Sequence, residues 1–431
     1  MATNRAFSAR RHRTLYYGAA VAVLAASCAL PSAVAAVTGP DPIRLFPPEP
    51  TGPYDVGRVE LHLADQGRGH PWVEGSEQRD LMVTLWYPAE GGGGEQARYV
   101  PDAVADIFAG ELEQAGLARD AVDFPGSHAN ATVGADVAAD AGELPVLLYS
   151  HGFNQTRHQA TAQVEELASQ GYAVVAMDHP YEASAVEFPD GRVVRNSIPG
   201  GMDQTETYRE AIATRVADTG FVLDAMAEVA DGSTPDVGGR PLPEGLGAAL
   251  DLSAVGMFGH SAGGLTAAEA MLGDDRIDAG INLDGSIAYH VGDEEWAEST
   301  VRGADRPFMI VGGGLSGGAE RVPHTSEHSP DWQRFRAAST GPLLELYLAK
   351  AQHMSFIDTQ WQIPQIDAGA RPDNPAWADM VADSVGTIDP DRSVAAQRAY
   401  LTAFFDAYMR GAERPLLDGP SPEHPDVAFI E

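Results

Sequence analysis

A serine flanked by glycines stands where an apolar segment meets a helical one. Residues 255–258 read Val-Gly-Met-Phe, positions 259–263 read Gly-His-Ser-Ala-Gly, and Gly264 follows. A serine at a sharp strand-to-helix turn is held in a strained conformation that lifts its hydroxyl above the sheet, and glycines let strand and helix approach closely. The N-terminus of the helix favours developing negative charge. The segment therefore predicts Ser261 as an oxygen nucleophile for attack on a carbonyl carbon.

A serine hydroxyl becomes reactive at neutral pH when a base, itself oriented by an acid, takes its proton. When the serine stands at such a turn, the acid and then the histidine follow it along the chain. Among the downstream histidines, His353 directly follows a strand-like segment at 343–348. It is therefore expected in a loop at the carboxyl edge of the sheet, as the base for Ser261. His324 and His328 lie in a polar, proline-flanked segment and are predicted to be solvated.

Asp284 is the expected acid. It stands at the end of the strand-like segment 279–283, which follows the nucleophile segment. The usual alternative is the end of the next strand, at 307–311, but there the chain continues into the glycine-rich residues 312–318 and has no acid before Glu320. A carboxylate at position 284 would fix the imidazole tautomer and stabilise the imidazolium that forms.

Two backbone N–H groups are needed to face the oxygen that becomes negative during attack. One is expected from Ala262, the residue after the nucleophile, and the other from a loop after an earlier strand. The apolar segment 144–149 ends in a Ser-His-Gly turn, which exposes the N–H of Phe153. His151 is interpreted as a turn residue and His260 as a residue packed behind the nucleophile.

The elements that must position these residues alternate along the chain. Short segments rich in Val, Leu, Ile and Tyr alternate with longer segments of helical periodicity, which is typical of strand-helix-strand units in a mostly parallel sheet. Strands are predicted at residues 81–87, 144–149, 173–177, 255–258, 279–283, 307–311 and 343–348. Helices are predicted at residues 159–170, 205–229, 262–271 and 394–410.

These elements predict a doubly wound α/β sheet in a single catalytic domain at residues 51–415, with loop insertions and a C-terminal tail at 416–431. A long insertion at 356–393 precedes the last helix and is either a cover over a pocket or a surface excursion. The aromatic residues of the last helix stand at helical spacing and are expected in the core. They are Tyr400, Phe404, Phe405 and Tyr408.

The N-terminus has the pattern of an export signal. Four arginines precede an apolar run at 15–30, and the small residues Ser-Ala-Val-Ala-Ala follow at 32–36. This pattern predicts a signal peptide over residues 1–35 and a secreted protein that begins near Ala36. A membrane-spanning helix is the alternative, but the run is shorter than the ~20 residues that a span requires. A lipid anchor at Cys28 is a second alternative.

Composition excludes several classes of partner. The chain has 62 acidic and 28 basic residues and a net charge of −34, so its surface repels nucleic acid and anionic lipid headgroups. Cys28 is the only cysteine, and its loss with the signal would leave neither disulfide nor thiolate ligand. The glycine-rich segments 91–94 and 312–318 lack a nucleotide-binding pattern and are expected to be loops. No cofactor or metal is expected. A proline-rich arm is predicted at 36–50.

Several segments together resemble one family. They are Gly-Pro-Tyr-Asp-Val-Gly at 52–57, Trp-Tyr-Pro at 86–88, Tyr-Ser-His-Gly at 149–152, the serine segment at 259–264, Leu-Asp at 283–284, and His-x-Ser-Phe-x-Asp at 353–358. With them, residues 50–410 resemble the platelet-activating-factor acetylhydrolases of the plasma and lipoprotein-associated type, which are α/β-hydrolases.

The resemblance implies Ser261, Asp284 and His353 as the catalytic triad, and the N–H groups of Phe153 and Ala262 as the oxyanion hole. It also implies a calcium-independent esterase that removes short or oxidised acyl groups from phospholipids, with transient contact to a lipid surface. A general esterase, a polyester hydrolase and a peptidase of the same fold are alternatives. A non-catalytic surface binding protein is a further one. The sequence leaves the oligomeric state open.

Overall fold

The computed structural model describes residues 41–91, 93–289, 295–315, 322–370 and 375–431. The predicted signal peptide and the first residues of the predicted arm lie outside these ranges. Within them, one large sheet has the order β14-β13-β11-β10-β9-β5-β6-β2-β1-β4-β3, and β12 pairs with β11. The strands from β13 to β6 in this order are parallel, and those beyond β6 and at β14 include antiparallel pairs.

The strands of the sheet are β1 Asp55–Asp65, β2 Arg79–Ala89, β3 Gln96–Arg98, β4 His128–Val133, β5 Leu144–Ser150, β6 Ala173–Met177, β9 Leu250–His260, β10 Ile277–Leu283, β11 Phe308–Leu315, β12 Val322–Pro323, β13 Leu343–Gln352 and β14 Val427–Phe429. A separate hairpin consists of β7 Ala185–Glu187 and β8 Val193–Arg195.

The α-helices are α1 Asp102–Gln114, α2 Thr161–Ser169, α3 Gln204–Ala230, α4 Leu246–Ala249, α5 Ala262–Gly273, α6 Glu298–Arg302, α7 Pro330–Ala338, α8 Thr359–Ala370, α9 Pro375–Ser384 and α10 Pro390–Met409. Short 3-10 helices are η1 Arg157–Ala160, η2 His353–Phe356 and η3 Pro415–Leu417. Among these helices, none is long and apolar enough to cross a membrane.

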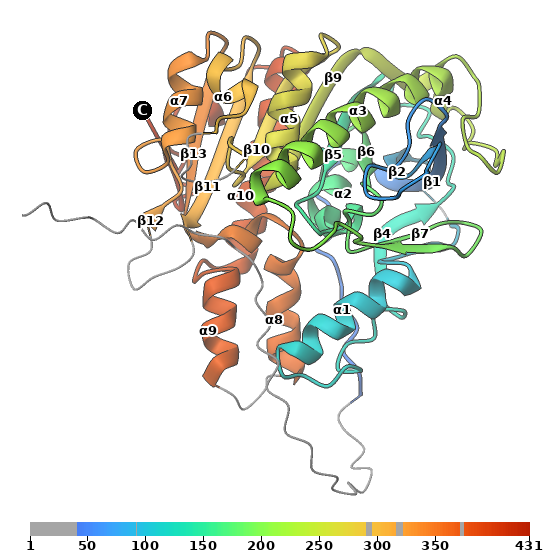
Figure 1. The fold of residues 1–431 in the computed structure, drawn as a ribbon, viewed down its shortest axis with the longest axis horizontal. Helices are drawn as coiled ribbons and strands as arrows, with labels where there is room; N and C mark the ends of the chain where they lie inside the picture. The colour runs from blue at the N-terminus through green and yellow to red at the C-terminus, as the bar shows by residue number, and fades with distance from the viewer. Residues whose placement is uncertain (1–40, 92, 290–294, 316–321, 371–374) are drawn as a thin grey trace, which may run out of the picture.

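Helices cover both faces of the parallel strands, and the alternation of side chains along β5 shows why. Val146 and Leu148 belong to the core layer with α3 and α5, whereas Leu147 and Tyr149 belong to the layer with α2 and α10. Successive residues of a strand point to opposite faces, so a strand buried on both sides is apolar throughout. Figure 1 shows α3 and α5 on one side of the sheet and α10 on the other.

The insertion before the last helix is helical. It forms η2, α8 and α9, and Trp361 and Trp377 from it pack with α1 and with Leu45 of the N-terminal arm in a third apolar cluster. In Figure 1 α1, α8 and α9 lie together beyond the end of the sheet. The segment that the sequence left undecided therefore contains a packed helical unit, α8 and α9, which begins at Thr359 after the short helix η2 that carries His353.

All seven predicted strands are present, but three other expectations need correction. The tail expected at 416–431 carries β14, which pairs with the edge of β13. The glycine-rich segment expected as a loop at 312–318 continues β11 as far as Leu315. The expected core residue Tyr408 is 41% exposed. In the described part of the predicted arm, Ile43 bridges to Val122 and Leu45 is buried. Extended backbone gains its hydrogen bonds from neighbouring strands, which local composition does not reveal.

Candidate active site

The nucleophile position is a strained turn between β9 and α5. Ser261 has φ 55° and ψ −120°, a conformation that residues with a side chain rarely adopt. Its N–H donates to the carbonyl of Leu283 at the end of β10, 3.0 Å away. The turn is thus fixed to the neighbouring strand, and α5 begins at the next residue.

Glycines are required around this turn because no space remains for a side chain. A Cβ on Gly263 would lie 1.9 Å from the carbonyl oxygen of Ser150, and one on Gly259 would lie 2.3 Å from the backbone of Gly263. Gly264 faces Asn282 in the same way, at 1.9 Å. The glycines of the motif therefore set the distance between β9, α5 and the end of β5.

The structure brings together the three side chains that the sequence singles out. His353, the first residue of η2 after β13, has its Nε2 3.0 Å from Ser261 Oγ. Its Nδ1 lies 2.6 Å from Asp284 Oδ2. A carboxylate only accepts hydrogen bonds, so Nδ1 carries the proton and Nε2 is left to accept from the serine hydroxyl. The ring therefore stands in the orientation that a general base for Ser261 requires.

Asp284 is buried at the end of β10 and is 3% exposed. Its Oδ1 accepts hydrogen bonds from the N–H of Gly313 at 2.8 Å and from Nδ1 of His324 at 2.9 Å. Burial opposes ionisation, but His324 and His353 together hold the pKa of Asp284 well below its usual range. Asp284 is thus an ionised acceptor with both oxygens hydrogen-bonded.

His324 corrects one prediction from the sequence. It was expected to be solvated, but it is 3% exposed and its ring stacks on Trp332 with centroids 4.0 Å apart. The reason is the hairpin of β11 and β12, which returns the chain antiparallel to β11 and places position 324 beside Asp284. His328 is exposed, as expected. Glu320, the first acid after the strand predicted at 307–311, lies outside the described residues.

His260 packs behind the nucleophile, and its ring centroid is 4.5 Å from that of His353. Its Nε2 donates to the carbonyl oxygen of His353 at 2.9 Å. Burial, with a smaller contribution from His353, lowers the pKa of His260 to about 3. The neutral ring therefore holds the backbone of His353 in place.

The two amides expected as oxyanion donors are both free to donate. Within the described part of the chain, no hydrogen bond from the N–H of Phe153 or of Ala262 is found. Ala262 is the first residue of α5, where an N–H has no partner inside its own helix. The Phe153 ring stacks on Tyr208, with centroids 4.9 Å apart and an interplanar angle of 17°.

Arg215, which the sequence did not single out, orients the loop after β5. This buried residue of α3 donates to the carbonyl oxygens of His151 at 2.5 Å and Gly152 at 3.2 Å. Its Nε donates to Glu182 at 2.8 Å. In a trans peptide the C=O and N–H point in opposite directions, so holding Gly152 O aims the N–H of Phe153 the other way. The signal in the sequence that could have identified Arg215 is a charged residue on the buried face of the helix predicted at 205–229.

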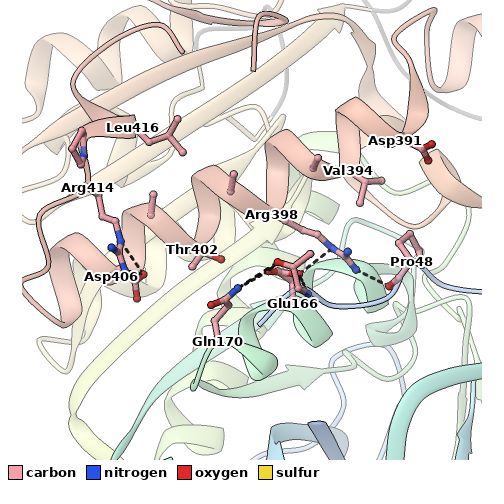
Figure 2. A pocket seen from close by; sticks show the side chains of 15 residues that line it. Pro48, Glu166, Gln170, Asp391, Val394, Arg398, Thr402, Asp406, Arg414 and Leu416 are labelled. Atoms are coloured by element: carbon pink, nitrogen blue, oxygen red, sulfur yellow. Dashed lines mark hydrogen bonds and ion pairs between the residues drawn. The ribbon is translucent and has the colours of Figure 1, made fainter. Parts of the chain in front are cut away.

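A separate cavity of about 590 Å³ lies on the outer side of α10 (Figure 2). Its lining contains none of Ser261, Asp284 and His353. Several polar groups there bind one another or the backbone: Arg398 donates to the carbonyl of Pro48 at 2.8 Å, and Gln170 donates to Glu166 at 2.8 Å. The described residues form no group of acidic, histidine and cysteine side chains that could hold a metal ion.

The doubly wound sheet, with the serine turn after β9, the acid after β10 and the histidine after β13, defines the chain as an α/β-hydrolase. Residues 44–310 match the model of the family described as platelet-activating factor acetylhydrolase, isoform II, and the chain belongs to this family.

Known relatives agree with this assignment. A probable 1-alkyl-2-acetylglycerophosphocholine esterase of Arthroderma benhamiae is 28% identical over 92% of this chain and 96% of its own length. The platelet-activating factor acetylhydrolase of Cavia porcellus is 26% identical over 55% of each chain. The solved structure of a ferulic acid esterase from Streptomyces cinnamoneus superposes with a TM-score of 0.68 at 33% identity, over 89% of this chain and 98% of that one. The protein is therefore an enzyme of the esterase class.

Proposed function

We propose that the protein is a serine carboxylic-ester hydrolase that cleaves short-acyl phospholipid or related esters through an acyl-enzyme on Ser261. The observation that carries the proposal is the continuous hydrogen-bonded chain from Ser261 Oγ through both ring nitrogens of His353 to Asp284. The free N–H groups of Phe153 and Ala262 complete the set of groups that acyl transfer needs.

The arrangement supports a two-step reaction. Ser261 Oγ attacks the ester carbonyl while Nε2 of His353 takes its proton, and the carbonyl oxygen becomes an oxyanion that accepts from Phe153 and Ala262. Collapse breaks the bond to the alcohol oxygen, which receives the proton from His353. Water, deprotonated by the same nitrogen, then attacks the acyl carbon. Collapse breaks the bond to Ser261 Oγ, which takes the proton back from His353, and the acid is released. Asp284 stays ionised throughout and stabilises the imidazolium of His353.

A fluorophosphonate probe tests the nucleophile directly, because it forms a covalent bond only with an activated serine. Wild-type protein should be labelled and should hydrolyse p-nitrophenyl acetate, whereas Ser261→Ala should lose labelling and at least ~10³-fold in kcat. Ser253→Ala is the matched control, since Ser253 is exposed on the same strand β9. Labelling of Ser261→Ala at the wild-type level would refute the mechanism.

A second candidate substrate class is an aryl ester, which the likeness to a ferulic acid esterase favours. The stacked pair of Phe153 and Tyr208, next to one proposed oxyanion donor, offers aromatic surface to such a group. The two substrate classes are distinguished by comparing kcat/KM values. The substrates are nitrophenyl esters from acetyl to palmitoyl, a short-acyl phosphatidylcholine and methyl ferulate. Preference for methyl ferulate over the phospholipid would replace the phospholipid assignment.

A further inference from the structure

The acid of the site serves two histidines. Asp284 Oδ2 faces Nδ1 of His353 at 2.6 Å, and Oδ1 faces Nδ1 of His324 at 2.9 Å. The second contact is made by the carboxylate oxygen that does not face His353. A hydrogen bond to each oxygen fixes the plane of the carboxylate, and with it the direction from which His353 is held.

The ring of His324 is held in place by contacts to a neighbouring indole and to the backbone. Its face stacks on Trp332, whose indole N–H donates to the carbonyl of Gly285 at 2.9 Å, one residue after the acid. The backbone N–H of His324 donates to Gly313 O at 2.8 Å, and Gly313 is also the second donor to Asp284. The His324 ring, the Trp332 indole and the backbone of Gly313 thus form one set of connected contacts around the Asp284 carboxylate.

Negative charges surround His324 on three elements. They are Asp284 at the end of β10, Asp331 on α7 and Glu345 on β13. Burial alone would lower the pKa of His324, but these carboxylates, Asp284 foremost, raise it above its ordinary value. Asp331 accepts a hydrogen bond from Ile287 N–H. Glu345 accepts from Ser326 and forms an ion pair with Arg336 at 2.9 Å, so Asp284 is the principal negative charge facing His324. A charged imidazolium is therefore the form that the site favours.

We propose that His324 is a positioning residue that acts as a cationic partner of Asp284 and so favours the neutral ring of His353, whose Nε2 is free to take the proton of Ser261. The inference rests on the proposed function of Ser261 and His353. Two imidazoles on one carboxylate repel each other when both are charged. A positive His324 therefore makes protonation of His353 Nε2 less favourable in the enzyme without substrate. On the far side of His353, the neutral His260 adds no opposing charge.

Two substitutions separate the charge of His324 from its hydrogen bond. His324→Asn keeps an N–H donor near the position of Nδ1 without the charge, and His324→Phe keeps an aromatic ring over Trp332 without a donor. The acid limb of kcat/KM against pH reports the base of the free enzyme. At constant ionic strength we expect the limb of His324→Asn to move to higher pH by about one unit, as two charges ~5 Å apart in a partly shielded site would produce.

His324→Phe should show the same shift and an additional fall of about tenfold in kcat, because Gly313 alone then holds Asp284 Oδ1. The exposed His328→Asn, from the same segment, is the control and should leave the profile unchanged. An acid limb of His324→Asn that coincides with that of the wild type would reduce His324 to a packing role and overturn the proposal.

A measurement on the wild-type protein covers the case in which these variants do not fold. In ¹⁵N-histidine-labelled protein, one buried imidazole should keep protons on both nitrogens to a higher pH than a free imidazole does, and this behaviour should disappear in Asp284→Asn. Absence of such an imidazolium contradicts the proposal. Because the measurement needs no turnover, its result stands even if labelling shows that Ser261 is not the nucleophile.

Discussion

At the scale of single residues, the site concentrates backbone strain. Ser261 and Asp284 both have positive φ, 55° and 56°, and neither is a glycine. Such conformations cost roughly 1–3 kcal/mol each and persist where the surroundings over-determine them. Here the fixing contacts are backbone hydrogen bonds, from Ser261 N–H to Leu283 O and from Asp284 N–H to Val311 O. The strain aims both side chains at His353.

Gly263→Ala tests how closely this turn is packed. A methyl group there would meet the backbone oxygen of Ser150 at 1.9 Å, and a backbone atom cannot move aside cheaply. We expect a loss of about 2 kcal/mol or more in the free energy of unfolding, since overpacking a core typically costs 1–3 kcal/mol, together with a large fall in kcat. Urea unfolding and p-nitrophenyl acetate hydrolysis measure the two effects.

Gly273→Ala is the matched control for that experiment. It lies at the end of the same helix, α5, and a Cβ there meets nothing within 4 Å. Alanine should be neutral or mildly stabilising at this position. If Gly263→Ala and Gly273→Ala had equal unfolding free energies and equal kcat, Gly263 would not be needed for steric reasons.

At the scale of elements, α3 supports the loop that follows β5. Arg215 of α3 donates to two successive carbonyls of that loop and pairs with Glu182. A guanidinium can make these bonds at once because its donors form a planar fork, whereas an ammonium is a point donor. The helix therefore orients an amide that is remote from it in sequence.

Arg215→Lys should keep the positive charge beside Glu182 and lose the double contact to the carbonyls. We expect kcat to fall by about 10- to 100-fold with little change in KM, because the aim of the Phe153 N–H matters most when the oxyanion has formed. Arg276→Lys, a change to a surface ion pair at the opposite end of β10, is the control. A rise in KM alone would show that Arg215 supports substrate binding and not the oxyanion hole.

The element after His353 is held by one buried carboxylate. Asp358 accepts from the N–H groups of Thr161 and Ala162 at the start of α2, from Tyr99 Oη and from Trp361 Nε1. It thereby joins η2 to α2 and to the helical unit of α8 and α9. This contact gives a structural reason for the Asp in the His-x-Ser-Phe-x-Asp segment: it fixes the loop that carries His353.

At the scale of the whole molecule, buried neutral histidines make the free energy of unfolding depend on pH. Burial lowers the pKa of His70 to about 4 and that of His260 to about 3, and it also lowers the pKa values of His151, His158 and His179. In the unfolded chain these rings take up protons below pH ~6.5, while in the folded protein they stay neutral. The unfolded state then binds more protons, so stability falls as the pH drops below about 6.5.

His158→Leu isolates one of these contributions. His158 is 1% exposed, and within the described structure neither of its ring nitrogens has a hydrogen-bond partner. Removal of a histidine that stays neutral should narrow the difference in unfolding free energy between pH 7.5 and pH 5 by about 2 kcal/mol. Urea unfolding at both values measures this. The exposed His128→Leu should leave the difference unchanged. A His158→Leu difference equal to that of the wild type would contradict the linkage.

The local pattern of the sequence was sufficient for the central sheet and for three side chains of the site. Strands that are buried on both faces form continuous apolar runs, so β5, β6, β9, β10, β11 and β13 were visible along the chain. β1 alternates charged and apolar residues and so forms no continuous apolar run, and β14 is too short to be recognised before it pairs with β13. Partners at the edges of the sheet are set by tertiary contacts.

Ser261, Asp284 and His353 each follow a strand, and the carboxyl ends of parallel strands share one edge, so their order in the sequence already predicts that they are neighbours. Arg215 and His324 follow no such rule. Arg215 reaches the loop after β5 from the middle of a helix, and His324 reaches Asp284 only because β12 folds back along β11. The sequence by itself thus determined which groups could do the chemistry. The tertiary structure decided which groups hold them, because those contacts join segments 40 and 64 residues apart whose own patterns carry no sign of the pairing.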